Sequence, residues 1–266
     1  MQNVLLAFFL TLLAGLSTGI GGLLAFFTKK DNKIFLAVSL GFSAGVMIYV
    51  SMIEIFQEAQ SILTVQLGGK LGGLTTTLAF FGGMLLIAII DKLIPDSENP
   101  HDLKKIPNEE CKSTEPQHLK RLGVLTALAI GIHNFPEGIA SFIASLQNPS
   151  IAIPTVVAIA IHNIPEGISV SVPIYQSTGS KLKALKYSFL SGLAEPIGAL
   201  VAWLILMPIL NDVVFGIIFA AVAGIMVFIS FDELLPAARE SGENHLSISG
   251  LISGMVIMSV SLLIFI

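Results

Sequence analysis

The chain has 266 residues, of which 54% are hydrophobic and only 12% are charged, and its net charge at pH 7 is -4. A soluble domain carries about a quarter charged residues, so a mean hydropathy of +0.85 excludes water as the main solvent of this chain. The small net charge and the lack of a basic patch among aromatic residues exclude a nucleic-acid partner. The single cysteine, Cys111, excludes an intramolecular disulfide and a zinc module built from CxxC pairs.

Long apolar runs recur along almost the whole sequence, and each can cross roughly 30 Å of hydrocarbon. They predict an all-α integral membrane protein with about eight transmembrane helices, surrounded by the lipid bilayer and forming one domain over residues 1–266. The expected helices span 3–27, 35–57, 72–93, 120–146, 151–173, 184–207, 213–235 and 246–266. A signal peptide would have basic residues before its apolar run, but the first run has none before Lys29. We therefore expect this run to be a transmembrane helix.

Only one connection between the expected helices is long. Residues 94–119 contain Pro95, Pro100, Pro107 and Pro116 among many charged residues. Such a composition favours an irregular or disordered loop over a second folded domain.

The basic residues predict how the chain is oriented. All fourteen Lys and Arg residues except Lys70 fall on one side of the expected membrane, in the connections or at the helix ends. Lys and Arg near helix ends remain on the cytoplasmic side. We therefore expect a multi-pass protein of the cell (inner) membrane, with both termini outside the cytoplasm and the 94–119 loop inside.

One octapeptide occurs twice, near the middle of the fourth and fifth expected helices. Residues 132–139 read Ile-His-Asn-Phe-Pro-Glu-Gly-Ile, and residues 161–168 read Ile-His-Asn-Ile-Pro-Glu-Gly-Ile. An acidic side chain at the bilayer midplane costs roughly 2.5–3.5 kcal/mol on insertion scales, so something must compensate it. Because the connection is short, the two helices must be antiparallel, and this inverted symmetry is typical of secondary transporters.

The octapeptides contain residue types that suit a divalent metal. The His and Glu of each copy are four residues apart, which places them on one helix face. The proline between them kinks the helix and frees a backbone carbonyl, and each Asn adds an amide oxygen. Imidazole, carboxylate and amide ligands suit zinc, iron and manganese. The candidate metal ligands, which include a further mid-helix acid beside a proline, are His133, Asn134, Glu137, His162, Asn163, Glu166 and Glu195.

The other polar residues give weaker indications. Glu54 and Glu58 are one turn apart near the outer end of the second expected helix, where a solvated helix end is favoured over an ion vestibule. No Lys or Arg falls in the centre of an expected span, so the interior charge is acidic and favours a cation path over an anion path. Ionised carboxylates at the midplane would repel one another, so we expect metal ions and protons to compete for them.

At the two His-Asn-x-Pro-Glu-Gly copies the chain resembles the ZIP (Zrt/Irt-like) metal transporter family, and over its whole length it is similar to the bacterial zinc-uptake branch of that family. The resemblance implies eight helices, a variable cytoplasmic loop after the third, and a two-metal site formed by the fourth, fifth and sixth helices. His133, Glu137, His162 and Glu166 would form one site. Asn134, Asn163 and Glu195 would complete its neighbour, with Glu137 and Glu166 bridging. Members move metal into the cytoplasm, often as homodimers, and the inner loop here is poorer in His than in many of them.

Three other functions compete with metal uptake as interpretations of this sequence. A membrane-embedded metalloprotease should show His-Glu-x-x-His, whereas Asn follows each His here and proline interrupts each motif. An ATP-driven pump would need a Gly-x-x-x-x-Gly-Lys-Ser/Thr loop, which this sequence lacks. A metal exporter stays open, because ligands and helix count do not set direction. The sequence thus predicts a transporter rather than an enzyme, with no catalytic cofactor. Its cargo would be Zn2+ foremost, and also Fe2+, Mn2+, Co2+ and Cd2+.

Overall fold

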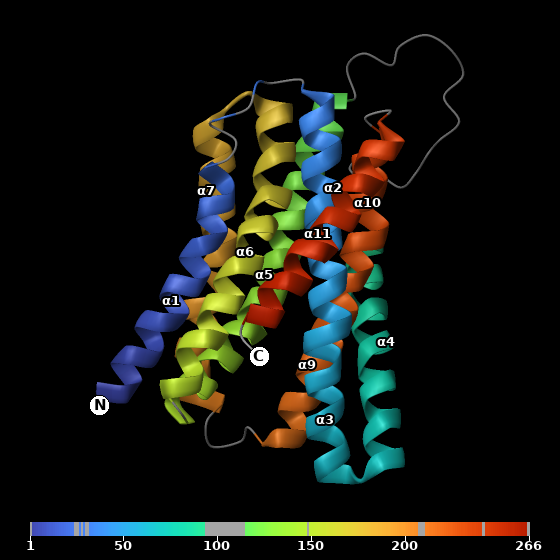
Figure 1. Cartoon of the computed structure of the whole chain (residues 1–266). Coiled ribbons are helices and arrows are strands. Elements are labelled where there is room, and N and C mark those ends of the chain that lie inside the picture. The colour runs from blue at the N-terminus through green and yellow to red at the C-terminus, as the bar shows by residue number, and fades with distance from the viewer. Residues whose placement is uncertain are drawn as a thin grey trace.

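The computed structural model describes residues 2–23, 27, 29, 32–93, 115–147, 149–206, 211–240 and 243–264. Helices make up nearly all of this part of the chain (Figure 1). In chain order the elements are α1 (Gln2–Leu23), α2 (Lys33–Val50), η2 (Ser51–Ile55), α3 (Phe56–Leu67), α4 (Gly69–Leu93), α5 (Glu115–Gln147), α6 (Pro149–Thr178), α7 (Lys181–Gly192), α8 (Ala194–Val201), η4 (Ala202–Leu206), α9 (Asp212–Ile229), η5 (Ser230–Leu234), α10 (Leu235–Glu240) and α11 (Asn244–Ile264).

These elements form eight continuous rods within the described residues. The π-helical turns η2, η4 and η5 join their neighbours without a loop, and α7 meets α8 at the single residue Leu193. Six stretches in the described part are by themselves long and apolar enough to cross a membrane: Val4–Leu23, Lys33–Leu67, Gly69–Ile90, Lys181–Ile205, Asp212–Glu240 and Asn244–Leu263. The other two rods are α5 and α6, which contain the octapeptides. The predicted all-α membrane fold is confirmed.

Two helix boundaries differ from the expected ones. The second rod continues to Leu67 instead of ending near residue 57, and its terminator is Gly68, whose φ of 83° favours glycine. The polar residues after position 56 had suggested an earlier end. Helix α5 begins at Glu115, because Pro116 lies in the first helical turn, where a missing N–H costs nothing. Residues 94–114, the rest of the expected loop, lie outside the described part.

Side-chain caps fix where three rods begin. The side-chain oxygens of Asn32, Ser180 and Asn211 accept hydrogen bonds from the backbone N–H groups of residues 35, 183 and 214, at 3.0, 3.3 and 3.0 Å. Each satisfies a donor that has no partner inside its helix. Gly179, with a φ of 68°, ends α6 and lets the chain turn into α7.

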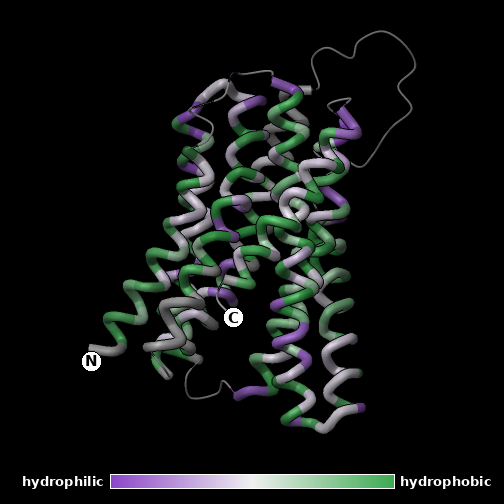
Figure 2. Tube along the Cα trace, viewed as in Figure 1, coloured by the Kyte–Doolittle hydropathy of each residue, from purple (hydrophilic) through white to green (hydrophobic). Residues whose placement is uncertain are grey.

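The rods pack as two bundles (Figure 1). The first bundle contains α1, α5, α6 and the α7–α8 rod, and the second contains the α2–α3 rod, α4, the α9–α10 rod and α11. Contacts of α2 with α6 and of α5 with α9 join them. Hydrophobic residues cover most of each rod, with hydrophilic residues at the turns and at a few points midway along the first bundle (Figure 2).

Close glycine contacts reveal an inverted repeat in the first bundle. A Cβ on Gly138 would lie 2.0 Å from the Glu195 carbonyl oxygen, and a Cβ on Gly167 would lie 1.8 Å from that of Thr18. Gly138 and Gly167 hold the same position in the two octapeptides, so α5 packs on α8 as α6 packs on α1. Because α5 and α6 are antiparallel, the two arrangements are inverted copies.

The second bundle repeats in the same way. A Cβ on Gly45 would lie 2.0 Å from the Leu251 carbonyl oxygen, and one on Gly224 would lie 1.9 Å from that of Phe80. The surrounding sequences match as well: residues 44–47 read Ala-Gly-Val-Met and residues 223–226 read Ala-Gly-Ile-Met. The π-helical turns η2 (Ser-Met-Ile-Glu-Ile) and η5 (Ser-Phe-Asp-Glu-Leu) follow at equivalent positions.

Candidate metal centre

The predicted ligands lie in the middle of the first bundle. Helix α5 contributes Asn134 and Glu137, α6 contributes His162, Asn163 and Glu166, and the first turn of α8 contributes Glu195. All six of these side chains are buried, and their exposed fraction does not exceed 8%. Burial of so many polar groups is costly unless each has a partner or a bound ion.

The two octapeptides meet at a direct contact between their side chains. The His162 Nε2 atom lies 2.6 Å from the Glu137 Oε1 atom, so an imidazole of α6 is hydrogen-bonded to a carboxylate of α5. This contact brings residues of both copies to one point, as the inverted arrangement predicts.

The asparagines connect the octapeptides to neighbouring helices. The Asn163 Nδ2 atom donates to the Ala14 carbonyl oxygen at 3.0 Å and also to the Glu195 Oε1 atom. The Asn134 Nδ2 atom donates to the Ser191 carbonyl oxygen at 3.4 Å. The Asn163 amide is thus oriented by its Nδ2 donor, and its Oδ1 atom has no hydrogen-bond partner among the described residues.

Helix α6 also contacts the second bundle through the backbone of its octapeptide. The Ser43 hydroxyl of α2 donates to the Pro165 carbonyl oxygen at 2.6 Å. The helix continues through Pro165 to Thr178, so the proline bends or loosens it without ending it. This hydrogen bond joins the two bundles close to the metal candidates.

The centre is strongly acidic. Glu54, Glu137 and Glu166 lie close enough to His162 for their charges to act on it. Glu137 and Glu166 act in the same way on Glu195. The Lys and Arg residues of the described chain lie at rod ends, away from this centre. Three carboxylates therefore act on one imidazole, the fourth lies near two of them, and no described Lys or Arg side chain balances their charge.

Besides the Glu54 Oε2 atom, three buried polar atoms of the centre have no hydrogen-bond partner among the described residues: the His162 Nδ1 atom, the Asn163 Oδ1 atom and the Glu195 Oε2 atom. A buried atom left in this state costs roughly 1–3 kcal/mol. All three are of the types that coordinate borderline divalent cations. The donor set therefore fits a metal ion as a passing substrate.

Two parts of the predicted site are not seen among the described residues. The side chain of His133 lies outside the described residues, although α5 includes its backbone. Across the described side chains, no group of three or more His, Cys, Asp or Glu residues is gathered closely enough to hold a metal ion. The assembled two-metal site thus stays a prediction.

The sequence interpretation missed Glu54. It placed this residue at a solvated helix end, but the rod continues for three turns beyond it, and the Glu54 Oε2 atom is buried. Glu58, one turn further, is exposed as expected. The signal that could have found Glu54 is the repeat, because Glu54 in η2 matches the buried Glu233 in η5.

The comparisons with known proteins agree with this architecture. The model of the family described as ZIP Zinc transporter matches residues 91–262. The chain is 69% identical over 265 residues to the zinc transporter ZupT of Streptococcus mutans, with 100% of this chain and 99% of that protein covered. It is 62% identical over 268 residues to the zinc transporter ZupT of Lysinibacillus sphaericus, with 99% of each covered. To the Clostridium perfringens zinc transporter ZupT it is 58% identical over 279 residues, with 100% and 98% covered.

Fold and site together define a multi-pass helical membrane protein with a buried, acidic, polar centre shared by two inverted helix pairs. The length of the matches and the identities to the relatives define the family of this protein. The chain belongs to the ZIP family.

Proposed function

We propose that this protein carries divalent transition-metal cations, zinc foremost, across the cell membrane into the cytoplasm. The observation that carries the proposal is the acidic centre in which Glu54, Glu137 and Glu166 act on His162 and Glu195 lies near Glu137 and Glu166, without a described basic side chain. Only a cation, or protons, would neutralise this centre in a low-dielectric interior. The relatives named zinc transporters support zinc as the cargo.

In this proposal two adjacent metal positions share the centre. His133, Glu137, His162 and Glu166 hold one ion. Asn134, Asn163 and Glu195 complete the second, with Glu137 and Glu166 bridging. Iron, manganese, cobalt and cadmium use the same ligand types and would compete with zinc. The protein acts as a transporter and not as an enzyme, so no catalytic cofactor is needed.

Orientation and movement complete the proposal. The described basic residues other than Lys70 lie near the starts of α2, α5 and α7 and near the ends of α4 and α10, and these rod ends share one side (Figure 1). By the positive-inside rule this side is cytoplasmic and both termini are outside. The two bundles supply the parts that move against each other, so that the centre opens first to one side and then to the other. Assembly as a homodimer is part of the same expectation.

The test is metal uptake by the reconstituted full-length protein. Vesicles containing a zinc-sensitive dye would be loaded with the wild type, Glu137→Ala or Glu166→Ala, with the exposed Glu58→Ala as the matched control. We expect both octapeptide variants to insert normally and lose uptake, and the control to transport at the wild-type rate. Wild-type uptake by either octapeptide variant would overturn the proposal, and zinc leaving vesicles against its gradient would establish an exporter instead.

A second variant separates charge from structure at Glu195. Glu195→Gln keeps the oxygen that accepts the Asn163 amide but removes the negative charge. We expect the unfolding temperature to stay near that of the wild type while zinc uptake falls by at least tenfold, since the second ion loses an anionic ligand. Concentration series in the same vesicles would show whether KM or the maximal rate changes. Unaltered uptake would remove Glu195 from the proposed ligands.

A further inference from the structure

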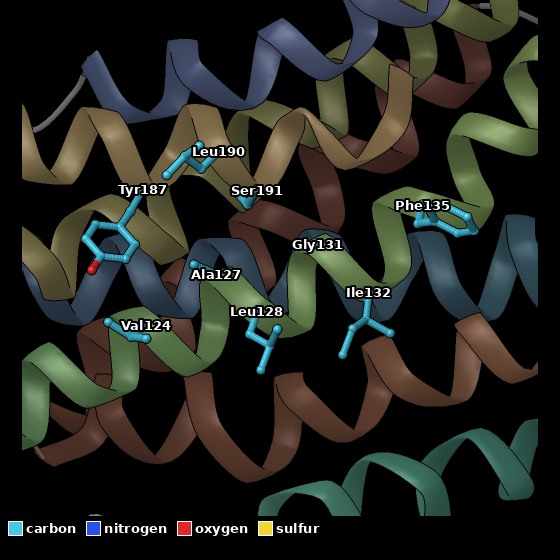
Figure 3. Close-up of a pocket in the computed structure, with 9 residues that line it drawn as sticks. All are labelled: Val124, Ala127, Leu128, Gly131, Ile132, Phe135, Tyr187, Leu190 and Ser191. Atoms are coloured by element: carbon cyan, nitrogen blue, oxygen red, sulfur yellow. The ribbon is translucent and has the colours of Figure 1, made fainter. Parts of the chain in front are cut away.

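A groove of about 660 Å³ lies between α5 and α7, outside the metal centre. Six of its lining residues belong to α5 and three to α7 (Figure 3). The lining is apolar apart from the Tyr187 and Ser191 hydroxyls, and Leu128 and Leu190 are more than half exposed. Gly131 forms part of the wall, where a Cβ would meet no described atom within 4 Å. The groove therefore opens toward the membrane.

The length of the groove matches one leaflet of a bilayer. Along α5 the lining extends from Val124 to Phe135, and eleven residues of helix rise about 16 Å. The hydrocarbon core of a bilayer is about 30 Å thick, so each leaflet contributes about half of it. A single acyl chain lying along the groove would therefore reach from the headgroup level to the midplane.

One end of the groove is polar and basic. Val124 and Tyr187 pack together with Ile174 and Tyr175 at this end. Figure 3 shows the Tyr187 hydroxyl pointing away from the Phe135 end of the groove, toward the level of Val124. Lys183 lies one turn before Tyr187 on the same face of α7, and Lys186 lies on its flank.

Both ammonium groups are suited to binding an anion. Lys183 and Lys186 are exposed and make no ion pair within the described part of the chain. Lysines at this depth attract anionic headgroups, and tyrosine favours the membrane interface. One phospholipid would thus suit both parts of this site, with its phosphodiester at the lysines and an acyl chain in the apolar groove.

We propose that this groove binds one anionic phospholipid, with its phosphate at Lys183 and Lys186 and an acyl chain along α5 toward Phe135. The apolar wall holds the chain and the lysines select the headgroup charge. The inference goes beyond metal transport and depends only on the chain being in a membrane. Zwitterionic lipid without preference, or a second copy of this chain, are the competing occupants.

The experiment uses fluorescence quenching by phospholipids with brominated acyl chains. The full chain has one tryptophan, Trp203, so Trp203→Phe with Tyr187→Trp places the only indole inside the groove. The protein would be reconstituted in mixtures of phosphatidylglycerol and phosphatidylcholine, with one or the other brominated, to obtain their relative affinity at that position. The native chain serves as the matched control, since Trp203 is exposed elsewhere on η4.

We expect phosphatidylglycerol to bind at the groove more tightly than phosphatidylcholine, by about fivefold for each of the two lysines near its phosphate, and we expect a ratio near one at Trp203. Lys183→Gln with Lys186→Gln should reduce the groove ratio to about one, while Lys70→Gln at the opposite membrane surface should leave it unchanged. Gly131→Leu should fill the groove and at least halve quenching by either lipid.

Three results would overturn the inference. The first is a groove ratio near one with both lysines present. The second is a ratio that does not respond to their removal. The third is a groove indole that neither lipid quenches while Leu190→Cys forms a disulfide between copies, which would make the groove an interface of the protein with itself. The lysine variants change only exposed side chains, so the test does not depend on Gly131→Leu folding.

Discussion

At a few positions of this molecule, two helices come so close that only glycine fits between them. Gly138 and Gly167, the glycines of the two octapeptides, let the helices that hold the metal candidates touch the backbones of α8 and α1. Such close approach brings Glu195 within reach of the octapeptide residues. The sequence pattern pointed to the His, Asn and Glu residues of the octapeptides, but it gave no reason for their glycines.

Gly138→Ala tests this role. Its Cβ would lie 2.0 Å from a carbonyl oxygen, so α5 and α8 must separate, and we expect a loss of about 1–3 kcal/mol in the free energy of unfolding. Gly73→Ala is the control, because its Cβ meets nothing described and alanine favours a helix by up to about 1 kcal/mol. Thermal unfolding in detergent measures both, and equal unfolding temperatures would contradict the close-packing argument.

At the level of elements, the two bundles meet where α6 packs on α2 and α5 packs on α9. The Ser43 hydroxyl makes one of these contacts, since it joins α2 to the octapeptide of α6. Ser39 lies one turn earlier on the same helix, and within the described residues its hydroxyl bonds only to the Leu36 carbonyl oxygen of α2 itself. The pair therefore offers a comparison of a bond between bundles with a bond inside a helix.

Ser43→Ala should lower the free energy of unfolding by about 0.6–1.7 kcal/mol, the range measured for hydrogen bonds between membrane helices. Ser39→Ala should have a smaller effect, because the Leu36 carbonyl keeps its place in the helix. Unfolding in detergent titrations compares the two variants with the wild type. A larger loss for Ser39→Ala would show that the contact between bundles contributes little.

The helices themselves could be predicted from the sequence, and the details of their ends could not. Long apolar runs, together with the turn residues between them, predict eight rods, because each rod must cross the same hydrocarbon thickness. The continuation of the second rod to Leu67 was missed because polar residues in a helix outside the hydrocarbon look like a loop. The π-helical turns have no signal in hydropathy, and the position of Glu54 follows from one of them.

For the candidate site, the sequence predicted the residues and their helix faces but not the contacts between them. The spacing within each octapeptide placed its residues on one helix face, and the short connection set the helices antiparallel. The contact between His162 and Glu137 crosses from one copy to the other. The residue spacing pairs residues only within a copy, and the grouping of Glu137 with His162 came from the family resemblance. Spacing alone does not predict such a contact, because it depends on how far one helix is shifted along its neighbour.

For the molecule as a whole, the sole cysteine gives a direct test of orientation. Cys111 belongs to the expected cytoplasmic loop and lies outside the described residues. A membrane-impermeant maleimide should label it in inside-out vesicles and leave it unlabelled in intact cells. Cys111→Ser combined with Lys70→Cys should give the opposite result, because Lys70 lies on the other side. Labelling of Cys111 from outside would reverse the assigned topology.

The inverted repeat also defines a second conformation of the protein, in which the two halves exchange their backbone arrangements. If each half takes the backbone that the other half has now, the result is a complete molecule whose openings toward the two sides of the membrane are interchanged. The exchange is not exact, since Glu195 corresponds to Thr18 and Asp232 corresponds to Ile53, so that two carboxylates have no counterpart. The two ends of a transport cycle would therefore differ in energy, and this asymmetry of charge would give the resting protein a preferred side.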